Sequence, residues 1–161
     1  MQKNVNSKEG FSLVEMMLVL LIVAAVMGVG QDHWRQFRAK QALLLASGEL
    51  MEFIHYWRQR ANGTQQQITL VAQLSQPQVC SIAIEYAGKP QTSFILRTPG
   101  VVWGEREEQI PITLIGRRNH ALGGHFTLMN TLGKVRVIVS GLGRIRRCAL
   151  STTPIGDIAP C

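Results

Sequence analysis

Few side chains in this 161-residue chain have the types and spacing that catalysis or metal binding requires. Its four histidines are scattered: His33, His55, His120 and His125. None lies in H-E-x-x-H spacing, and no neighbouring carboxylate or cysteine completes a metal site. Gly141-Leu142-Gly143 is half of a dinucleotide fingerprint without its third glycine, and Ser140 has no base beside it. We therefore expect no enzyme, no metal site and no cofactor.

A lone carboxylate, Glu15, interrupts the apolar run from Phe11 to Gly30. This run has about the ~20 residues that a membrane span needs, and a carboxylate within lipid costs ~2.5–3.5 kcal/mol. Glu15 therefore needs a partner. One interpretation is a capping box, in which Ser12 and Glu15 satisfy backbone N–H groups at the helix start. That interpretation leaves the preceding polar segment unexplained. Its lysines, Lys3 and Lys8, favour a cytoplasmic N-terminus and a periplasmic remainder.

The stretch Lys8-Glu9-Gly10-Phe11-Ser12-Leu13-Val14-Glu15 resembles the prepilin processing site of type IV pilins and type II secretion pseudopilins. The resemblance implies that residues 1–10 are a leader, that prepilin peptidase cuts after Gly10, and that Phe11 becomes the methylated N-terminus. It also implies that Glu15 pairs with the N-terminal amine of a neighbouring subunit in the filament. An opposite charge at that distance would offset the desolvation cost of the carboxylate.

The absence of any proline before Pro77 favours a minor subunit, because many major pilins carry a helix-kinking proline in this region. The β-rich pattern of residues 63–161 resembles the head of the GspH/FimT family of minor pseudopilins. The leader, a Gly-Arg-x-Arg-x-Cys stretch and a short cysteine-closed tail resemble those of enterobacterial prepilin-peptidase-dependent pilins. It implies partners among major and minor pilins or pseudopilins, prepilin peptidase and an inner-membrane assembly platform. The chain would cross the inner membrane once before it primes or caps a type IV pilus or a type II secretion pseudopilus at the cell surface. The leader and helix do not separate these two systems, because both use them.

Arginines cluster near the C-terminus, in Gly143-Arg144-Ile145-Arg146-Arg147-Cys148. In an extended segment Arg144 and Arg146 project to the same side about 7 Å apart, a spacing that matches successive phosphates of one nucleic-acid strand. The stretch is similar to the Gly-Arg-x-Arg motif of FimT-type minor pilins, which implies DNA contacts by Arg144 and Arg146, with Arg147 as an additional basic residue. The alternatives are a solvated strand, contacts between subunits, or pairing with the acidic loop Gly104–Glu108. The net charge of +7 favours an anionic partner but does not identify it.

Residues 31–62 predict an amphipathic helix that continues the apolar run of residues 11–30 and ends near Asn62-Gly63. The stripe that would face the core comprises Ala46, Leu50, Phe53, Ile54, Trp57 and Ala61. With 46% hydrophobic and 17% charged residues, the composition is that of a folded chain.

Residues 63–161 predict a β-rich head, because short β-branched runs alternate with glycine and proline breaks. Expected strands are Gln67–Leu74, Val79–Tyr86, Ser93–Leu96, Ile110–Ile115, His125–Asn130, Lys134–Ser140 and Arg144–Cys148. The expected fold class is therefore α+β: one long helix packed on a small all-β head of two antiparallel sheets.

The three cysteines show no C-x-x-C spacing, and in an oxidising compartment a disulfide is expected. Cys148 and Cys161 bracket a tail with few apolar side chains to dock it, so a bridge between them would hold the C-terminus. Cys80 lies in an apolar run and is expected to be a buried thiol. The alternative pairing of Cys80 with Cys148 stays open.

Overall fold

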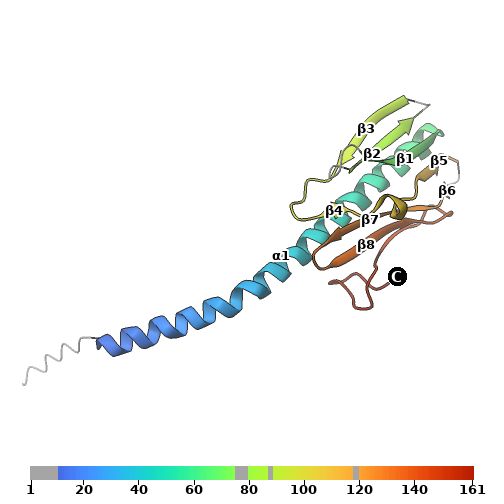
Figure 1. Cartoon of the computed structure of the whole chain (residues 1–161). Coiled ribbons are helices and arrows are strands. Elements are labelled where there is room, and N and C mark those ends of the chain that lie inside the picture. The colour runs from blue at the N-terminus through green and yellow to red at the C-terminus, as the bar shows by residue number, and fades with distance from the viewer. Residues whose placement is uncertain (1–10, 75–79, 87–88, 118–119) are drawn as a thin grey trace, which may run out of the picture. The chain divides into compact units, whose positions relative to one another are not determined.

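The computed structural model describes residues 11–74, 80–86, 89–117 and 120–161 (Figure 1). Helix α1 runs through Leu13–Thr64 as one 52-residue element. The chain divides into two compact units, residues 1–36 and residues 37–161, which we call the N-terminal unit and the C-terminal unit. The expected cleavage site at Gly10 lies outside the described residues.

In the N-terminal unit, α1 presents apolar side chains to its surroundings on every side. Large residues between Leu13 and Met27 are all strongly exposed, Leu13 at 76% and Met27 at 64%. The most apolar 18-residue window has a mean hydropathy of 2.5 and none of it is buried. By length and composition this helix can cross a membrane, and an apolar surface all round fits lipid or a bundle of similar helices.

The C-terminal unit contains two antiparallel sheets, as the sequence predicts. One sheet has the strand order β3-β2-β1-β5-β6 and the other has the order β4-β7-β8-β9. The strands of the first are β1 Gln67–Leu74, β2 Cys80–Tyr86, β3 Lys89–Ile95, β5 Ile112–Ile115 and β6 Ala121–Leu122. The strands of the second are β4 Val102–Trp103, β7 Gly124–Asn130, β8 Gly133–Val139 and β9 Ile145–Ala149.

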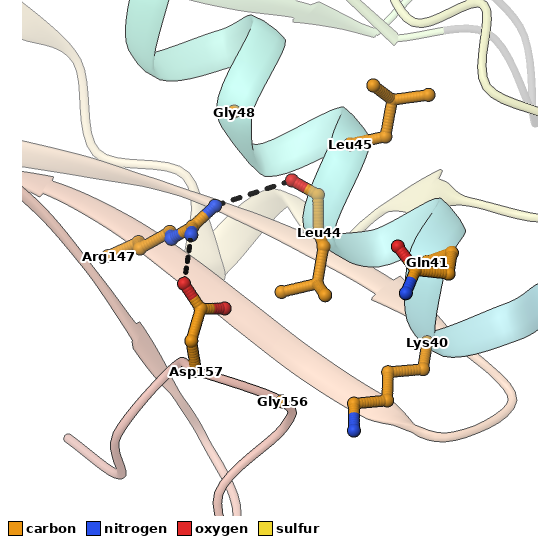
Figure 2. A pocket seen from close by; sticks show the side chains of 8 residues that line it. All are labelled: Lys40, Gln41, Leu44, Leu45, Gly48, Arg147, Gly156 and Asp157. Carbon is orange, nitrogen blue, oxygen red and sulfur yellow. Dashed lines mark hydrogen bonds and ion pairs between the residues drawn. The ribbon is translucent and has the colours of Figure 1, made fainter. Parts of the chain in front are cut away.

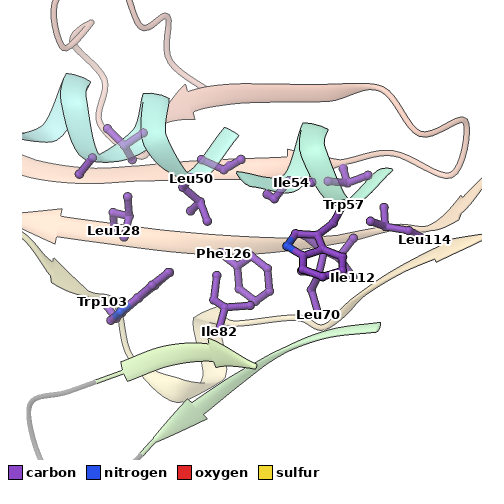
Figure 3. Close-up of a cluster of buried hydrophobic side chains, with 14 of the residues drawn as sticks. Leu50, Ile54, Trp57, Leu70, Ile82, Trp103, Ile112, Leu114, Phe126 and Leu128 are labelled. Atoms are coloured by element: carbon purple, nitrogen blue, oxygen red, sulfur yellow. The ribbon is translucent and has the colours of Figure 1, made fainter. Parts of the chain in front are cut away.

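The core of this unit forms where α1 meets the inner faces of the two sheets (Figure 3). Alternation along β8 puts Val135, Val137 and Val139 on the inner face, each at most 1% exposed. Figure 3 shows Leu50 and Ile54 of α1 with Phe126 of β7, all with no exposed surface. Complete burial of such side chains stabilises the fold by about 1.5–3 kcal/mol each.

The predicted stripe on α1 is largely confirmed. Of the six predicted residues, only Phe53 is half-buried, and its ring lies 4.8 Å from that of Phe94 on β3. The buried stripe also begins earlier than predicted, at Leu43, and it includes Ser47; both are fully buried. Ser47 is compatible with this position because its hydroxyl donates to the Leu44 carbonyl at 3.0 Å.

Strand boundaries differ from the prediction in the first sheet. The third strand was expected at Ser93–Leu96, but β3 begins at Lys89 and includes Pro90. A proline without an N–H group is compatible with β3 because this strand lies at the sheet edge. Strands β4 and β6 have two residues each and were not predicted, since so short a run has no periodicity of its own.

The C-terminal tail is anchored by apolar side chains as well as by a disulfide, which corrects the expectation that it has few to dock it. Ile155 and Ile158 are 7% and 2% exposed within the core cluster. Their backbones bond reciprocally at 3.1 Å, and this tight turn points both side chains inward. Further along, the Ala149 N–H group donates to the Ala159 carbonyl at 2.8 Å, so the tail also covers part of the β9 edge.

Candidate functional sites

The first candidate site is the start of α1, where Phe11 and Glu15 are both exposed. The helix opens with the Met16 N–H group donating to the Ser12 carbonyl at 3.2 Å. Within residues 11–74 and the other described ranges, the Glu15 side chain has no hydrogen bond or ion pair, so the capping box with Ser12 is not formed. This carboxylate at the start of an apolar helix therefore has no partner among the described residues.

The second candidate site is the arginine cluster, which the structure divides into two groups. Arg144 precedes β9 and Arg146 lies on it, and both side chains are exposed. The register opposite β8 places Arg146 beside Ile138 on the face of the sheet that points away from α1, which we call the outer face. Neither guanidinium group is engaged with another described residue, so both are available to an anionic partner.

Arg147 points the other way, toward α1, because adjacent residues of a strand alternate between its faces. Figure 2 shows its guanidinium group between the helix and the tail. It forms an ion pair with Asp157 at 2.8 Å and donates to the Leu44 carbonyl at 3.4 Å and the Ser47 hydroxyl at 3.3 Å. These contacts join three segments of the fold beside a shallow groove of about 650 Å³.

A further arginine, Arg58 of α1, was not singled out from the sequence. Its Nη1 donates to the Gly143 carbonyl at 2.6 Å and so holds the start of the Gly-Arg-x-Arg stretch on the helix. The imidazole of His55, one turn earlier, has a pKa below its usual range because of burial and the nearby Arg58 charge. No sequence spacing indicates this contact, because Arg58 and Gly143 lie 85 residues apart.

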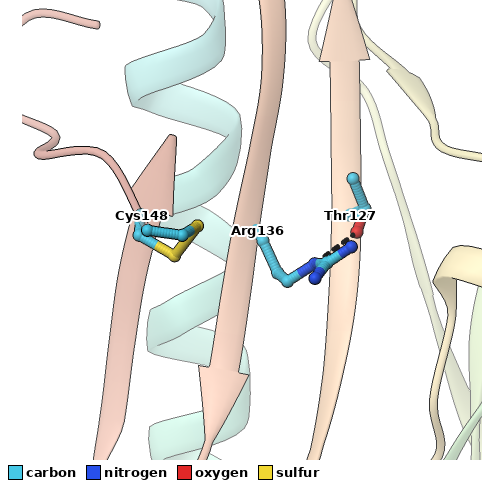
Figure 4. Close-up of a disulfide and its surroundings, with 4 residues drawn as sticks. Thr127, Arg136 and Cys148 are labelled. Carbon is cyan, nitrogen blue, oxygen red and sulfur yellow. Dashed lines mark hydrogen bonds between the residues drawn. A yellow bond between two sulfur atoms is a disulfide. The ribbon is translucent and has the colours of Figure 1, made fainter. Parts of the chain in front are cut away.

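The expected disulfide between Cys148 and Cys161 is present in the structure, with Cα atoms 4.9 Å apart. It lies on the outer face, where Figure 4 shows it on the opposite side of the sheet from α1. Beside it, Arg136 Nε donates to the Thr127 hydroxyl at 3.3 Å. Cys80 is the first residue of β2. Its side chain lies outside the described part of the structure, so the expectation of a buried thiol stays a prediction.

The acidic loop pairs with a lysine and not with the arginines of the cluster. Glu108 Oε1 accepts from Lys134 Nζ at 2.6 Å. This hydrogen bond lowers the pKa of the Glu108 carboxyl group and raises the pKa of Lys134. Nearby, burial and the Arg136 charge lower the pKa of His125, although Glu108 opposes this shift. The ion pair between Glu108 and Lys134 holds the loop Gly104–Glu108 against the outer face of the sheet.

Metal binding finds no support within the described residues, which contain no cluster of three or more histidine, cysteine or acidic side chains able to hold an ion. His120 is exposed, and His125 lies on β7 near the Glu108 carboxylate.

Two comparisons with known proteins gave matches, one to a sequence motif and one to a fold. Residues 5–30 match the family described as the prokaryotic N-terminal methylation motif. No curated protein matches the chain by sequence. Among solved structures, the type IV minor pilin FimU of Pseudomonas aeruginosa matches with a TM-score of 0.51 at 20% identity, over 68% of this chain and 90% of FimU. A second crystal form of FimU covers 65% of this chain and 91% of FimU at the same identity, with a TM-score of 0.47.

At 20% identity the FimU match establishes the fold and not the role. The motif match covers the residues that also form the start of α1. The chain therefore has the architecture of a pilin: residues that match an N-terminal methylation motif lead into a long helix, and the fold matches that of FimU.

Proposed function

We propose that this chain is a minor pilin or pseudopilin that prepilin peptidase cleaves between Gly10 and Phe11, with methylation of the new Phe11 amine. The supporting observation is that the methylation motif at residues 5–30 runs directly into α1, which continues into the core of a pilin-fold head. A single apolar helix at the N-terminus fits insertion in the inner membrane. The lysines of the leader favour a cytoplasmic N-terminus and a periplasmic head.

Assembly follows from the two exposed features of the N-terminal unit. The apolar surface of α1 leaves lipid only for another apolar surface, which the helices of other pilins or pseudopilins supply. Glu15 has no partner within the described chain, and the N-terminal amine of a neighbouring subunit provides the opposite charge. This pair would set the axial register of the subunit within a type IV pilus or a type II secretion pseudopilus. The chain would prime or cap that filament at the inner-membrane assembly platform.

The test measures incorporation of the full-length chain into filaments sheared from cells. Glu15→Ala should reduce the amount in sheared filaments by about tenfold or more, because the remaining amine is left unpaired in an apolar surrounding. Asp32→Ala is the matched control, since Asp32 lies on the same helix beyond the apolar run. Incorporation of the Glu15 variant at the wild-type level, with equal processing of both chains, would contradict the proposed assembly.

A second candidate function is DNA binding by a FimT-type minor pilin during DNA uptake. It is favoured by the exposure of Arg144 and Arg146 and by the absence of other partners for them among the described residues. We leave Arg147 out of the proposed contact, because Asp157, Leu44 and Ser47 already engage its guanidinium group.

Anisotropy of a labelled DNA duplex, titrated with the full-length chain in nanodiscs, separates these roles. Arg144→Gln with Arg146→Gln should weaken binding at least about tenfold and reduce the salt slope by about 1.8, the value for two lost phosphate contacts. Arg147→Gln, the matched control, should leave binding within about threefold. If the double variant binds as the wild type does, the DNA role is wrong. If the double variant fails to enter filaments, the two arginines act in assembly.

A further inference from the structure

The net positive charge of the protein comes from one part of the chain. Residues 109–156 contain seven of the 17 lysines and arginines and none of the 10 acidic residues, so this segment alone accounts for the net charge of +7. Within it, Arg117, Arg144 and Arg146 are exposed. Lys134 and Arg147 of the segment pair with Glu108 and Asp157, so its attraction for anions comes from the exposed arginines.

The same segment carries two of the most exposed leucines of the C-terminal unit. Leu142 is 80% exposed in the turn between β8 and β9, and Leu122 is 60% exposed on β6. The Ala121 N–H group donates to the Gly141 carbonyl at 3.1 Å, so the turn and β6 lie side by side. We call Leu122, Leu142 and the turn of residues 140–143 the leucine tip.

The leucine tip is held rigidly by backbone and side-chain contacts. The Gly143 N–H group donates to the Ser140 carbonyl at 2.8 Å, and Gly143 adopts a φ of 70°, which glycine tolerates without strain. The Ser140 hydroxyl accepts from the Arg144 N–H group at 3.2 Å, and Arg58 holds the Gly143 carbonyl from the helix. Leu142 is thus displayed on an ordered turn and loses little conformational freedom on binding.

We propose that the leucine tip docks on an anionic lipid bilayer, with Leu122 and Leu142 inserted at the boundary between headgroups and acyl chains. Exposed aliphatic side chains on a segment that also carries exposed arginines are a combination that favours interfacial binding, since apolar insertion and headgroup attraction add. Leu142 projects from the apex of a turn, a convex shape that a deformable bilayer accommodates. The leucines cannot stack on bases as the aromatic side chains of single-strand binders do, so nucleic acid is the less suited partner.

The experiment uses the full-length chain in phosphatidylcholine nanodiscs, which cover the apolar half of α1. Binding of these nanodiscs to separate vesicles is measured by co-sedimentation, with vesicles of phosphatidylcholine alone or with phosphatidylglycerol. We expect binding to the phosphatidylglycerol vesicles, and a loss of about tenfold or more in Leu122→Ser with Leu142→Ser. Leu132→Ser is the matched control, because Leu132 lies in the turn at the other end of β8 and is 39% exposed. It should bind within about twofold of the wild type.

Three results would overturn the proposal. Equal binding to both vesicle types would remove the role of the anionic headgroups. Unchanged binding of the leucine double variant would mean adsorption by the arginines alone. A loss by the same variant of binding to a DNA duplex, with vesicle binding retained, would assign the leucines to nucleic acid. Unchanged urea midpoints check that both variants are folded, as expected for substitutions at exposed positions.

Discussion

Removal of the Cys148–Cys161 disulfide tests how the C-terminal tail contributes to the fold. The bridge closes a loop with a sequence separation of 13 residues. A loop of about 14 residues corresponds to ~3 kcal/mol on the chain-entropy estimate. Because Ile155 and Ile158 of this loop are buried in the core, the tail should unfold together with the rest of the C-terminal unit. We therefore expect Cys148→Ser with Cys161→Ser to lower its free energy of unfolding by about 3 kcal/mol.

The assay is urea unfolding of the full-length chain in nanodiscs, followed by tryptophan fluorescence. Trp57 and Trp103 are each 8% exposed and report on the core, whereas Trp34 is already 57% exposed. With a urea m-value of about 1–3 kcal/mol/M, a 3 kcal/mol loss shifts the midpoint by about 1–3 M. Reductant should reproduce this shift in the wild type, since Cys161 is exposed, and should leave the variant unchanged.

Two results would refute this reasoning. A shift below about 1 kcal/mol would mean that the disulfide does not constrain the unfolded chain as the loop estimate assumes. An unchanged core transition, with the tail alone removed by carboxypeptidase under native conditions, would mean that the two isoleucines do not join the tail to the core.

Two further predictions concern the ion pair and a glycine. Glu108→Gln should lower the urea midpoint near neutral pH, because it removes the ion pair with Lys134. Since the pKa of Glu108 is lowered in the folded state, the stability that its carboxylate contributes is complete above the usual carboxyl range and is lost as the pH falls through the folded-state pKa. The difference in midpoint from the wild type should therefore vanish in acid. The pKa of Lys134 is raised, so the stability that its ammonium group contributes is lost only as the pH rises through its folded-state pKa. A difference in midpoint that persists unchanged in acid would contradict the ion pair between Glu108 and Lys134. Gly124→Ala should cost about 1–3 kcal/mol or more, because its Cβ would overlap the Pro111 and Ile110 carbonyl oxygens, whereas a Cβ at Gly141 meets nothing closer than 3.7 Å. Equal urea midpoints for these two alanine variants would show that the close approach at Gly124 is not rigid.

Much of the fold follows from periodicity in the sequence. The three- and four-residue spacing of Ala46, Leu50, Ile54 and Trp57 predicts the buried face of α1, because few other arrangements bury all of them. The alternation of Val135, Val137 and Val139 predicts β8 in the same way. The two-residue strands β4 and β6 were not predictable, since only their pairing partners define them.

A candidate site could be predicted from the sequence where its residues are close together in the chain, and not where they are far apart. The N-terminal motif is contiguous, and its residues are identified without a structure. Arg147 was grouped with Arg146 as a neighbour in sequence, but the period of two along a strand places their side chains on opposite faces. Its partners Ser47 and Leu44 lie about a hundred residues away and carry no local signal.

The most direct test of the central claim is the mass of the N-terminal peptide of the protein isolated from cells with an active prepilin peptidase. The account predicts a peptide that begins at Phe11 and carries one methyl group on its amine, and a longer peptide that retains the leader when the peptidase is absent. A chain that still begins at Met1, or an unmethylated Phe11, in cells with the active enzyme would contradict it.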